Sequence, residues 1–327
     1  MAENFQDILF SDYLLQWLEL ARCTIAETTY YGYKAIISRQ ICPYFASRKI
    51  KLHDLKPYHI QDFYAWTLKT RKVTGNTIHH YHANIHKALK HATQTELIQS
   101  NPASKVMLPK KERYRSDFYT VEEMNRLLEA IRGEKIEVPV YLACWYGMRR
   151  GEVLGLRWKD IDFETMTITV NGVVVDKGET TRTENMKYRA GGKTHMSVRS
   201  FPLVAEVAAF LQKQREKQER NKQLMGTMYC VGWEGFVCVD DGGHLIRPEY
   251  LSRTFPKVLK KHDFRPIRFH DLRGSNASLL LDKGVDMKLI QSWLGHAHYS
   301  TTADIYAHLR VEKKRDLASV LSAGLGV

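Results

Sequence analysis

The second half of the sequence contains residues whose types and spacing could carry out chemistry on a phosphate. Its cations and imidazoles could hold an oxyanion, and a phenol could attack phosphorus. An arginine follows a glycine in YGMRRGEVLGLRW, and a lysine stands beside two glycines in YRAGGKTHMSVRSFPL. HDLR spaces a histidine and an arginine three residues apart, which places both side chains on one face of a helix. LGHAHYSTTADIYAHL places a tyrosine ten residues after a histidine. The candidate residues are Arg149, Lys193, His270, Arg273, His296 and Tyr306.

Each candidate taken alone has an ordinary structural explanation. With 49 Lys and Arg against 36 Asp and Glu, a single arginine or lysine is usually a solvated surface group. A tyrosine in an amphipathic helix is usually a packing residue. The functional interpretation therefore depends on the ordered set and not on any one member.

The length and composition indicate a two-domain globular protein that binds a polyanion. A chain of 327 residues is long for a single core, and 44% hydrophobic residues is ordinary for a globular protein. The formal charge of +13 and the pI near 9.4 favour nucleic acid as the partner. An anionic membrane surface is disfavoured, because the sequence has no basic amphipathic helix with a bulky apolar face.

Several other classes of protein and site are disfavoured. The sequence contains no run of roughly 18 apolar residues, so it predicts no membrane-spanning helix. Its start, MAENFQDILFSDY, lacks the basic residues and apolar core of a signal peptide, and we therefore expect a cytoplasmic protein. Five cysteines without a CxxC pair predict neither a zinc module nor a disulfide framework. A GxxxxGK[ST] phosphate loop does not occur, since RAGGKT lacks the earlier glycine.

The first hundred residues show helical periodicity. Apolar residues recur at helical spacing over residues 8–20, 28–41, 57–68 and 77–98. Pro43 is expected to end the second of these helices, and the pattern predicts a bundle of four helices as a first domain over residues 1–105. Residues 106–118, rich in Lys and Arg, are predicted to be an extended basic linker, which either runs beside a phosphate backbone or is a solvated connector.

The second domain, predicted over residues 119–327, mixes helices with strands. Thr120 and Glu123 have capping-box spacing at the start of a helix, and PVYLACWYGMR indicates a buried helix. The alternating, β-branched MTITVNGVVV predicts a strand, and YRAGGKTHMSVRSFPL predicts a hairpin whose turn is Gly191-Gly192. Helical patterns return over residues 203–223, from Pro248, and from His270 to the end. The predicted fold class is mostly α with a small antiparallel β-sheet in the second domain.

The candidate set resembles the catalytic constellation of the tyrosine recombinases, the lambda-integrase-type family of DNA strand-exchange enzymes. The matching residues are Gly147, Arg149, Glu152 and Leu154 to Leu156 for the GxR…E…L context, Lys193-Thr194 for the hairpin lysine, HDLR for the HxLR box, and the LGH…STT…Y stretch. The resemblance covers most of the chain, and its C-terminal boxes are the more specific part. It implies a helical core-binding domain and a mixed α+β catalytic domain that clamp DNA.

The resemblance also implies a reaction, in which a site-specific recombinase or integrase cleaves DNA by forming a 3′-phosphotyrosine. Arg149 and Arg273 would hold the non-bridging phosphate oxygens and stay charged at any working pH. Tyr306 would be the nucleophile. A free phenol is only about one part in a thousand ionised at neutral pH, so Tyr306 needs a base, for which His270 is the candidate.

Two further residues complete the implied reaction. Lys193 would protonate the departing 5′-oxygen, and His296 would hydrogen-bond to the phosphate. Because the ester keeps the bond energy, the resemblance implies no ATP. It implies no metal or other cofactor either, because the arginines would supply the electrostatic stabilisation.

The expected partner is double-stranded DNA, bound by four protomers. One nucleophile cuts one strand, so exchange between two duplexes needs four subunits. In VEKKRDLASVLSAGLGV, the residues Leu317, Val320 and Leu321 form an apolar stripe that would dock on a neighbouring subunit, as the family resemblance implies, or on its own subunit. The sequence leaves open whether accessory DNA-bending proteins take part and whether Tyr306 acts in cis or in trans.

Two features depart from the family pattern. Many members carry a histidine after the second arginine, where this chain has Gly274, which loosens a helix by about 1 kcal/mol relative to alanine but removes no required group. The small β domain that often precedes the core-binding domain is not found. We therefore expect a two-domain member of the family or a sequence that starts after that domain.

Other interpretations stay open. A type IB topoisomerase uses much the same pocket without site preference. A DNA-binding regulator would need no nucleophile, and a metal-dependent transposase is the most disfavoured. His79, His82 and His86 lie on roughly one helical face, which suits a solvated or DNA-facing surface better than a metal site, because no cysteine or carboxylate accompanies them.

Overall fold

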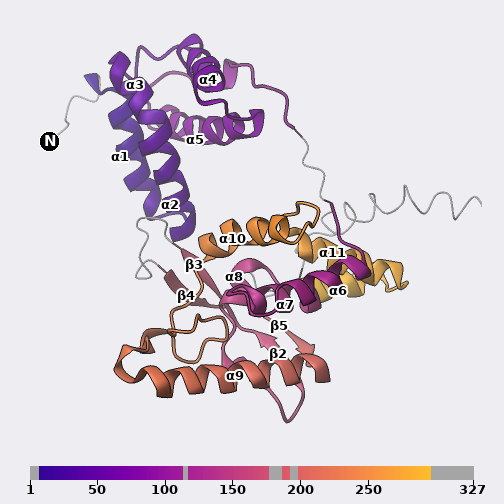
Figure 1. Cartoon of the computed structure of the whole chain (residues 1–327). Coiled ribbons are helices and arrows are strands. Elements are labelled where there is room, and N and C mark those ends of the chain that lie inside the picture. The colour runs from indigo at the N-terminus through magenta and orange to yellow at the C-terminus, as the bar shows by residue number, and fades with distance from the viewer. Residues whose placement is uncertain (1–6, 113–116, 177–185, 192–197, 296–327) are drawn as a thin grey trace, which may run out of the picture. The chain divides into compact units, whose positions relative to one another are not determined.

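Two compact units make up the chain in the computed structural model, which describes residues 7–112, 117–176, 186–191 and 198–295 (Figure 1). The described residues up to 112 belong to the first unit, and those from 117 onward belong to the second. Each unit has its own apolar core.

The first unit is a helical bundle around an aromatic-rich core. Its elements are α1 (Phe10–Arg22), α2 (Glu27–Ile36), a π-helical turn (Ile37–Ile41), α3 (Cys42–Arg48), α4 (Pro57–Arg71), α5 (Gly75–Gln94) and a 3₁₀ turn (Pro102–Lys105). The buried rings of Phe10 and Phe45 meet edge to face with centroids 4.9 Å apart, and the ring of Phe63 lies 5.3 Å from that of Phe45. Such aromatic pairs stabilise a core by about 0.5–1.5 kcal/mol each beyond the burial of their area.

The prediction that Pro43 ends the second helix is wrong. The chain continues from α2 through the π-helical turn into α3, and Pro43 lies in the first turn of α3. A proline is tolerated there because its missing N–H would have no partner in the first turn. The helix predicted over residues 28–41 is therefore divided, and α3 joins the four helices expected for this unit.

The predicted basic linker is held against the first unit along its described part. Gln61 contacts the backbone of Met107 twice, since its Nε2 donates to the carbonyl oxygen at 3.1 Å and its Oε1 accepts from the amide at 2.9 Å. Asn76 Nδ2 donates to the carbonyl oxygen of Glu112 at 2.7 Å. Residues 106–112 are therefore bound to α4 and α5 instead of extending freely.

Gly75 permits this docking, so its replacement should release residues 106–112. A Cβ at Gly75 would lie 2.6 Å from the carbonyl oxygen of Lys110, so Gly75→Ala forces the two backbones apart. We expect faster tryptic cleavage after Lys110, followed by mass spectrometry. Gly32→Ala in α2 is the control, because nothing lies within 4 Å of its added Cβ and alanine should stabilise the helix by about 1 kcal/mol. Equal cleavage rates in the two variants would argue against the docking.

The second unit contains further helices around a larger core. They are α6 (Val121–Ala130), α7 (Glu137–Tyr146), α8 (Arg150–Leu154), α9 (Ala205–Met225), α10 (Pro248–Lys261), α11 (Asp271–Asp282) and α12 (Met287–Leu294), with 3₁₀ turns at Trp158–Asp160, Gly226–Met228 and Val231–Trp233. The predicted capping box at the start of α6 is confirmed. The Thr120 hydroxyl accepts from the Glu123 amide at 3.3 Å, and Glu123 Oε2 accepts from the Thr120 amide at 2.9 Å.

The strands of the second unit form two small antiparallel sheets. They are β1 (Ile161–Asp162), β2 (Thr167–Val170), β3 (Gly172–Asp176), β4 (Met186–Ala190) and β5 (Arg199–Pro202). Among the described residues, one sheet has the order β1-β2-β5 and the other pairs β3 with β4.

Two predictions about these strands are wrong. The single strand predicted for MTITVNGVVV is two strands, β2 and β3, which lie in different sheets. They are separated at Asn171, whose side-chain amide donates to Asp160 Oδ1 at 2.9 Å and whose backbone carbonyl oxygen accepts from the Gly191 amide at 2.8 Å. The flanks of the predicted hairpin do not pair with each other either, since β4 pairs with β3 and β5 pairs with β2. The register places Phe201 opposite Ile168, and burial of this pair favours the observed partner.

The predicted fold class is confirmed, because the described chain is mostly helical with small antiparallel sheets in the second unit. No helix in the described ranges is both long and apolar enough to cross a lipid bilayer.

Candidate active site

A left-handed glycine turn between α7 and α8 positions Arg149. Gly147 ends α7 with φ of +59°, and its Cβ would lie 2.6 Å from the Cδ2 atom of Leu294, so a side chain is excluded there. Arg149 is the extended residue at the N-terminus of α8. The glycine turn therefore brings the guanidinium of Arg149 towards the end of α12.

Glu152 fixes the direction of Arg149. One carboxylate oxygen accepts from Nη1 of Arg149 at 2.9 Å, and the other accepts from its backbone amide at 2.8 Å. The Glu152 side chain is only 5% exposed. Burial alone would raise its pKa, but the hydrogen bonds and charge of Arg199, followed by those of Arg149, hold the pKa at about 2. Glu152 is thus an ionised group that orients Arg149.

Arg273 lies on the buried face of α11. Its Nη1 donates to the carbonyl oxygen of Gly147 at 2.7 Å, and its Nη2 donates to the carbonyl oxygen of Leu294. Burial, followed by repulsion from Arg149, lowers the pKa of Arg273 from its ordinary value. The two guanidiniums donate to the carbonyl oxygens of adjacent residues, Arg273 to that of Leu294 and Arg149 to that of Gly295, which brings the two charges near each other.

Three arginines converge on the last turn of α12. The carbonyl oxygen of Trp293 accepts from Arg199 Nε at 3.1 Å, that of Leu294 accepts from Arg273, and that of Gly295 accepts from Arg149 Nη2 at 2.9 Å. The described residues end at Gly295, directly before the LGH histidine. The backbone that leads into this histidine is therefore held by fixed cations.

His270 lies at the N-terminus of α11, one turn before Arg273. Although the residue as a whole is exposed, the protein atoms around its ring remove part of the ring's hydration. This partial desolvation, followed by repulsion from Arg273, lowers the pKa of His270 below its ordinary value. A lowered pKa favours the neutral imidazole at pH 7, which is the form that accepts a proton. The second unit thus brings together Arg149, His270 and Arg273.

The other three candidates, Lys193, His296 and Tyr306, lie outside the described residues. The apolar stripe of Leu317 and its neighbours does so too.

Arg199, which the sequence analysis did not select, belongs to the same network. Its Nη1 and Nη2 donate to the two carboxylate oxygens of Glu152 at 3.1 and 2.7 Å, and its side chain is 8% exposed. A signal was present in the sequence, because Arg199 and the apolar Phe201 are two residues apart and so share one face of a strand. A charged residue on a buried strand face requires a buried partner.

Gly274 makes room for an aromatic ring, a role that the sequence analysis missed. Its Cβ would lie 2.6 Å from the Cδ1 atom of Phe118 and would overlap the ring further along. Ser275 Oγ accepts from the Tyr119 amide at 2.9 Å, so the chain that precedes α6 crosses α11 at this point. At the position where many family members carry a histidine, this chain thus has a glycine, and the ring of Phe118 packs against its backbone.

Introducing the family histidine should therefore destabilise the second unit. We expect Gly274→His to lower the free energy of unfolding by about 1–3 kcal/mol through overpacking, measured by urea denaturation. Combining Gly274→His with Phe118→Ala should recover part of the lost free energy of unfolding, because removal of the Phe118 ring leaves space for the histidine. Additive losses in the double variant would contradict the proposed overlap.

Three of the histidines of α5, those that the sequence analysis places on one face, contact neighbouring segments. His79 Nε2 lies 2.9 Å from the carbonyl oxygen of Pro109, His82 Nδ1 lies 2.9 Å from the Tyr64 hydroxyl, and His86 Nε2 lies 3.2 Å from the hydroxyl of Ser104. No cluster of His, Cys, Asp or Glu within the described ranges is placed to hold a metal ion. The three contacts join α5 to α4 and to the segment that follows α5 within the first unit.

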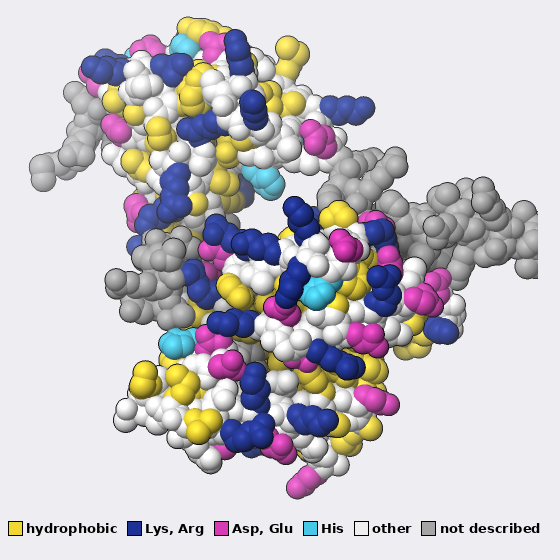
Figure 2. All heavy atoms as spheres, viewed as in Figure 1, with side chains coloured by type: hydrophobic (Ala, Val, Ile, Leu, Met, Phe, Trp, Pro, Cys, Tyr) yellow, Lys and Arg dark blue, Asp and Glu magenta, His cyan; other side chains and the backbone are white. Residues whose placement is uncertain are grey.

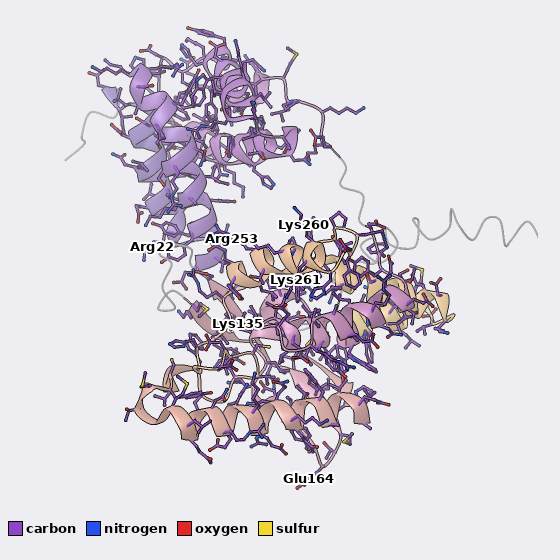
Figure 3. All side chains as sticks on the ribbon, in the orientation of Figure 1. Arg22, Lys135, Glu164, Arg253, Lys260 and Lys261 are labelled. Atoms are coloured by element: carbon purple, nitrogen blue, oxygen red, sulfur yellow. The ribbon has the colours of Figure 1, made fainter. Side chains whose placement is uncertain are left out.

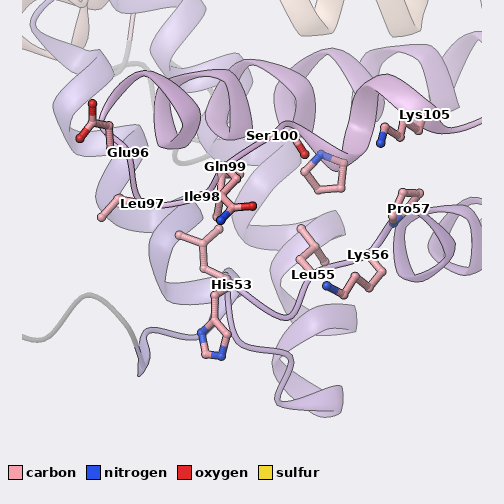
Figure 4. A pocket seen from close by; sticks show the side chains of 12 residues that line it. His53, Leu55, Lys56, Pro57, Glu96, Leu97, Ile98, Gln99, Ser100 and Lys105 are labelled. Atoms are coloured by element: carbon pink, nitrogen blue, oxygen red, sulfur yellow. The ribbon is translucent and has the colours of Figure 1, made fainter.

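A cavity of about 470 Å³ lies in the first unit, between the loop that precedes α4 and the turn that follows α5 (Figure 4). Leu55, Lys56 and Ile98 are among its lining residues. None of the candidate catalytic residues lines it.

Helix α10 carries a row of exposed cations. Arg253, Lys257 and Lys260 recur at spacings of four and three, so they share one face, while Leu251 and Phe255 are buried on another. Figure 3 labels Arg253 and Lys260 along this helix, and Figure 2 shows Lys and Arg side chains gathered over this part of the second unit. Such a row can follow a phosphate backbone.

Two family models match the chain. The one described as "Phage integrase family" matches residues 117–313, and the one described as "Phage integrase, N-terminal SAM-like domain" matches residues 9–65. The chain is 27% identical over 330 residues to a "Tyrosine recombinase XerC-like" protein of Caldanaerobacter subterraneus, covering 98% of this chain and 84% of the relative. It is 27% identical over 306 residues to the ICEBs1 integrase of Bacillus subtilis, covering 92% and 80% of the two chains.

Solved structures resemble the fold. A Tn1549 transposon integrase in complex with a circular intermediate DNA superposes with a TM-score of 0.73 at 17% identity, covering 94% of this chain and 99% of the other. A lambda integrase dimer bound to a core site superposes with a TM-score of 0.61 at 18% identity, covering 90% and 76%. At these identities the superpositions show a shared fold.

Proposed function

Because the chain belongs to the phage integrase family of tyrosine recombinases, enzymes of site-specific DNA recombination, we propose that it cleaves and rejoins DNA strands through a covalent 3′-phosphotyrosine at Tyr306. The proposed substrate is double-stranded DNA that carries a recombination site of a mobile element, in the cytoplasm.

The convergence of Arg149 and Arg273 on adjacent carbonyl oxygens carries the proposal. Both guanidiniums are anchored by the protein before any substrate binds, through Glu152 for Arg149 and through Gly147 for Arg273. Cations fixed in advance stabilise developing negative charge without having to reorganise during the reaction. A phosphodiester under attack is such a developing charge.

In the proposed reaction the phenolic oxygen of Tyr306 attacks phosphorus, and Arg149 and Arg273 stabilise the non-bridging oxygens. His270 accepts the phenolic proton, and its lowered pKa supports this role because the neutral ring predominates at pH 7. The bond to the 5′-oxygen of the next nucleotide breaks as the bond to the phenolic oxygen forms.

Lys193 and His296 complete the proposal. Lys193 protonates the departing 5′-oxygen, and His296 hydrogen-bonds to the phosphate. The phosphotyrosine ester retains the energy of the broken bond, so attack by a 5′-hydroxyl rejoins the strand without ATP. The arginines supply the charge stabilisation, so the reaction is proposed to need no metal.

DNA binding and assembly follow the same logic. We propose that residues 1–105 form the core-binding domain, that residues 119–327 form the catalytic domain, and that the two clamp the duplex, with the α10 cations near phosphates. Four protomers would act together and exchange their C-terminal segments. A solved lambda integrase tetramer bound to a Holliday junction supports this assembly by analogy of fold.

The test is incubation with a DNA fragment that carries the recombination site, in EDTA, followed by a denaturing gel and peptide mapping. We expect a covalent protein–DNA adduct at Tyr306. Absence of an adduct on site-bearing DNA would overturn the proposal, and a requirement for added Mg²⁺ would favour a metal-dependent transposase. Equal relaxation of plasmids with and without the site would favour a type IB topoisomerase.

A further inference from the structure

We propose that Arg199 is a positioning residue for strand cleavage, which holds Glu152 and the end of α12 so that Arg149 points at the scissile phosphate. The inference rests on the proposed function and adds a residue to it. It comes from the position of Arg199, which donates both to Glu152 and to the end of α12, the two places to which Arg149 also donates.

Arg199 bridges these two elements. Its Nη1 and Nη2 form a fork on the carboxylate of Glu152, at 3.1 and 2.7 Å, while its Nε donates to the carbonyl oxygen of Trp293 at 3.1 Å. A Cβ on Gly295 would lie 3.3 Å from Cδ and Nη1 of Arg199, and Gly295 has a φ of +65°. The arginine therefore packs against the backbone that leads directly into His296.

The geometry separates Arg199 from the residues that would touch DNA. Each of its three guanidinium nitrogens donates to Glu152 or Trp293, and its side chain is 8% exposed, compared with 39% for Arg149. Its effect on a phosphate would therefore be exerted through Glu152 and through the end of α12.

The charge balance gives this role a measurable signature. Among the described residues, Glu152 faces the guanidiniums of Arg149, Arg199 and Arg273. Arg199 supplies the largest interactions that oppose the cost of burying this carboxylate. Without Arg199, burial raises the pKa of Glu152, and a protonated Glu152 accepts from Arg149 less well. The orientation of Arg149 should then depend on pH.

The direction of that dependence follows from the protonation of Glu152. In the wild type, the pKa of Glu152 is about 2, so the carboxylate is ionised across the working range and adds no pH dependence. In Arg199→Met, Glu152 should be protonated at acid pH and ionised as the pH rises. Cleavage should therefore be impaired most at acid pH and recover towards alkaline pH.

The experiment compares single-turnover cleavage of a nicked suicide substrate by Arg199→Met and by the wild type, from about pH 5.5 to about pH 9, with the DNA affinity measured at each pH. We expect a loss of about 100-fold at the acid end, since misplacement of a catalytic group can cost this much, with DNA affinity unchanged. The loss should shrink as the pH rises. Adding Glu152→Gln to Arg199→Met should abolish this recovery, because no carboxyl remains to titrate.

Arg157→Met is the matched control. Arg157 donates through Nε to the buried carboxylate of Asp160 at 3.1 Å, as Arg199 donates to the buried carboxylate of Glu152, but the Arg157–Asp160 pair touches none of the candidate catalytic residues. Its loss should lower stability by a comparable amount and leave the pH profile of cleavage as in the wild type. Arg199→Lys keeps the charge and loses the fork, so it should remove the pH dependence while retaining part of the rate loss.

A profile of Arg199→Met parallel to those of the wild type and Arg157→Met would overturn the inference. If Arg199→Met does not fold, Arg199→Gln, which keeps donors but no charge, carries the same pH test. A wild type that forms no adduct would instead defeat the proposed function, so the two failures are distinguishable.

Discussion

A Tyr306→Phe variant is expected to bind recombination-site DNA as tightly as the wild type and to form no covalent adduct. The substitution removes one oxygen atom and leaves the ring and the surrounding charges in place. Because the proposed nucleophile is that oxygen, cleavage should fall by at least about 10⁴-fold, as it does when other enzymes lose their nucleophile. The measurements are gel-shift affinity and adduct formation on denaturing gels.

Tyr299→Phe provides the matched control, since it removes a phenolic oxygen from the same stretch of sequence. It should form the adduct at close to the wild-type rate. If Tyr306→Phe retained the adduct, or if Tyr299→Phe lost it, the nucleophile would have been assigned to the wrong residue.

The second large effect is expected for Arg149→Lys, which should reduce cleavage by about 10²–10³-fold, as the loss of one stabilising donor commonly does. Lysine keeps the positive charge but not the fork. The guanidinium of Arg149 donates to Glu152 and to the Gly295 carbonyl oxygen at the same time, each at 2.9 Å, which leaves its direction fixed. An ammonium group cannot reproduce this geometry.

Arg150→Lys is the neighbouring control. Arg150 contacts the carbonyl oxygen of Pro248 and the hydroxyl of Ser252 on α10 and belongs to none of the site contacts. It should cleave at close to the wild-type rate. Equal losses at Arg149 and Arg150 would indicate that charge or stability, and not fork geometry, limits the reaction.

Much of this protein is encoded in short stretches of sequence. The capping box of Thr120 and Glu123 and the start of α11 at HDLR depend on contacts within a few residues, so spacing alone was sufficient to predict them. The roles of Lys193, His296 and Tyr306 stay predictions from spacing and resemblance.

The tertiary structure alone decided the features that depend on residues far apart in the chain. Arg199 acquires its role from Glu152 and Trp293, and Gly274 owes its importance to Phe118. The strand pattern of residues 167–176 was compatible with several partners, and the tertiary structure divides it between two sheets at Asn171, whose side chain and backbone contact Asp160 and Gly191. Local periodicity specifies which face of an element is apolar, but the partner of a buried charge, a strand edge or a glycine is chosen by packing across the whole unit.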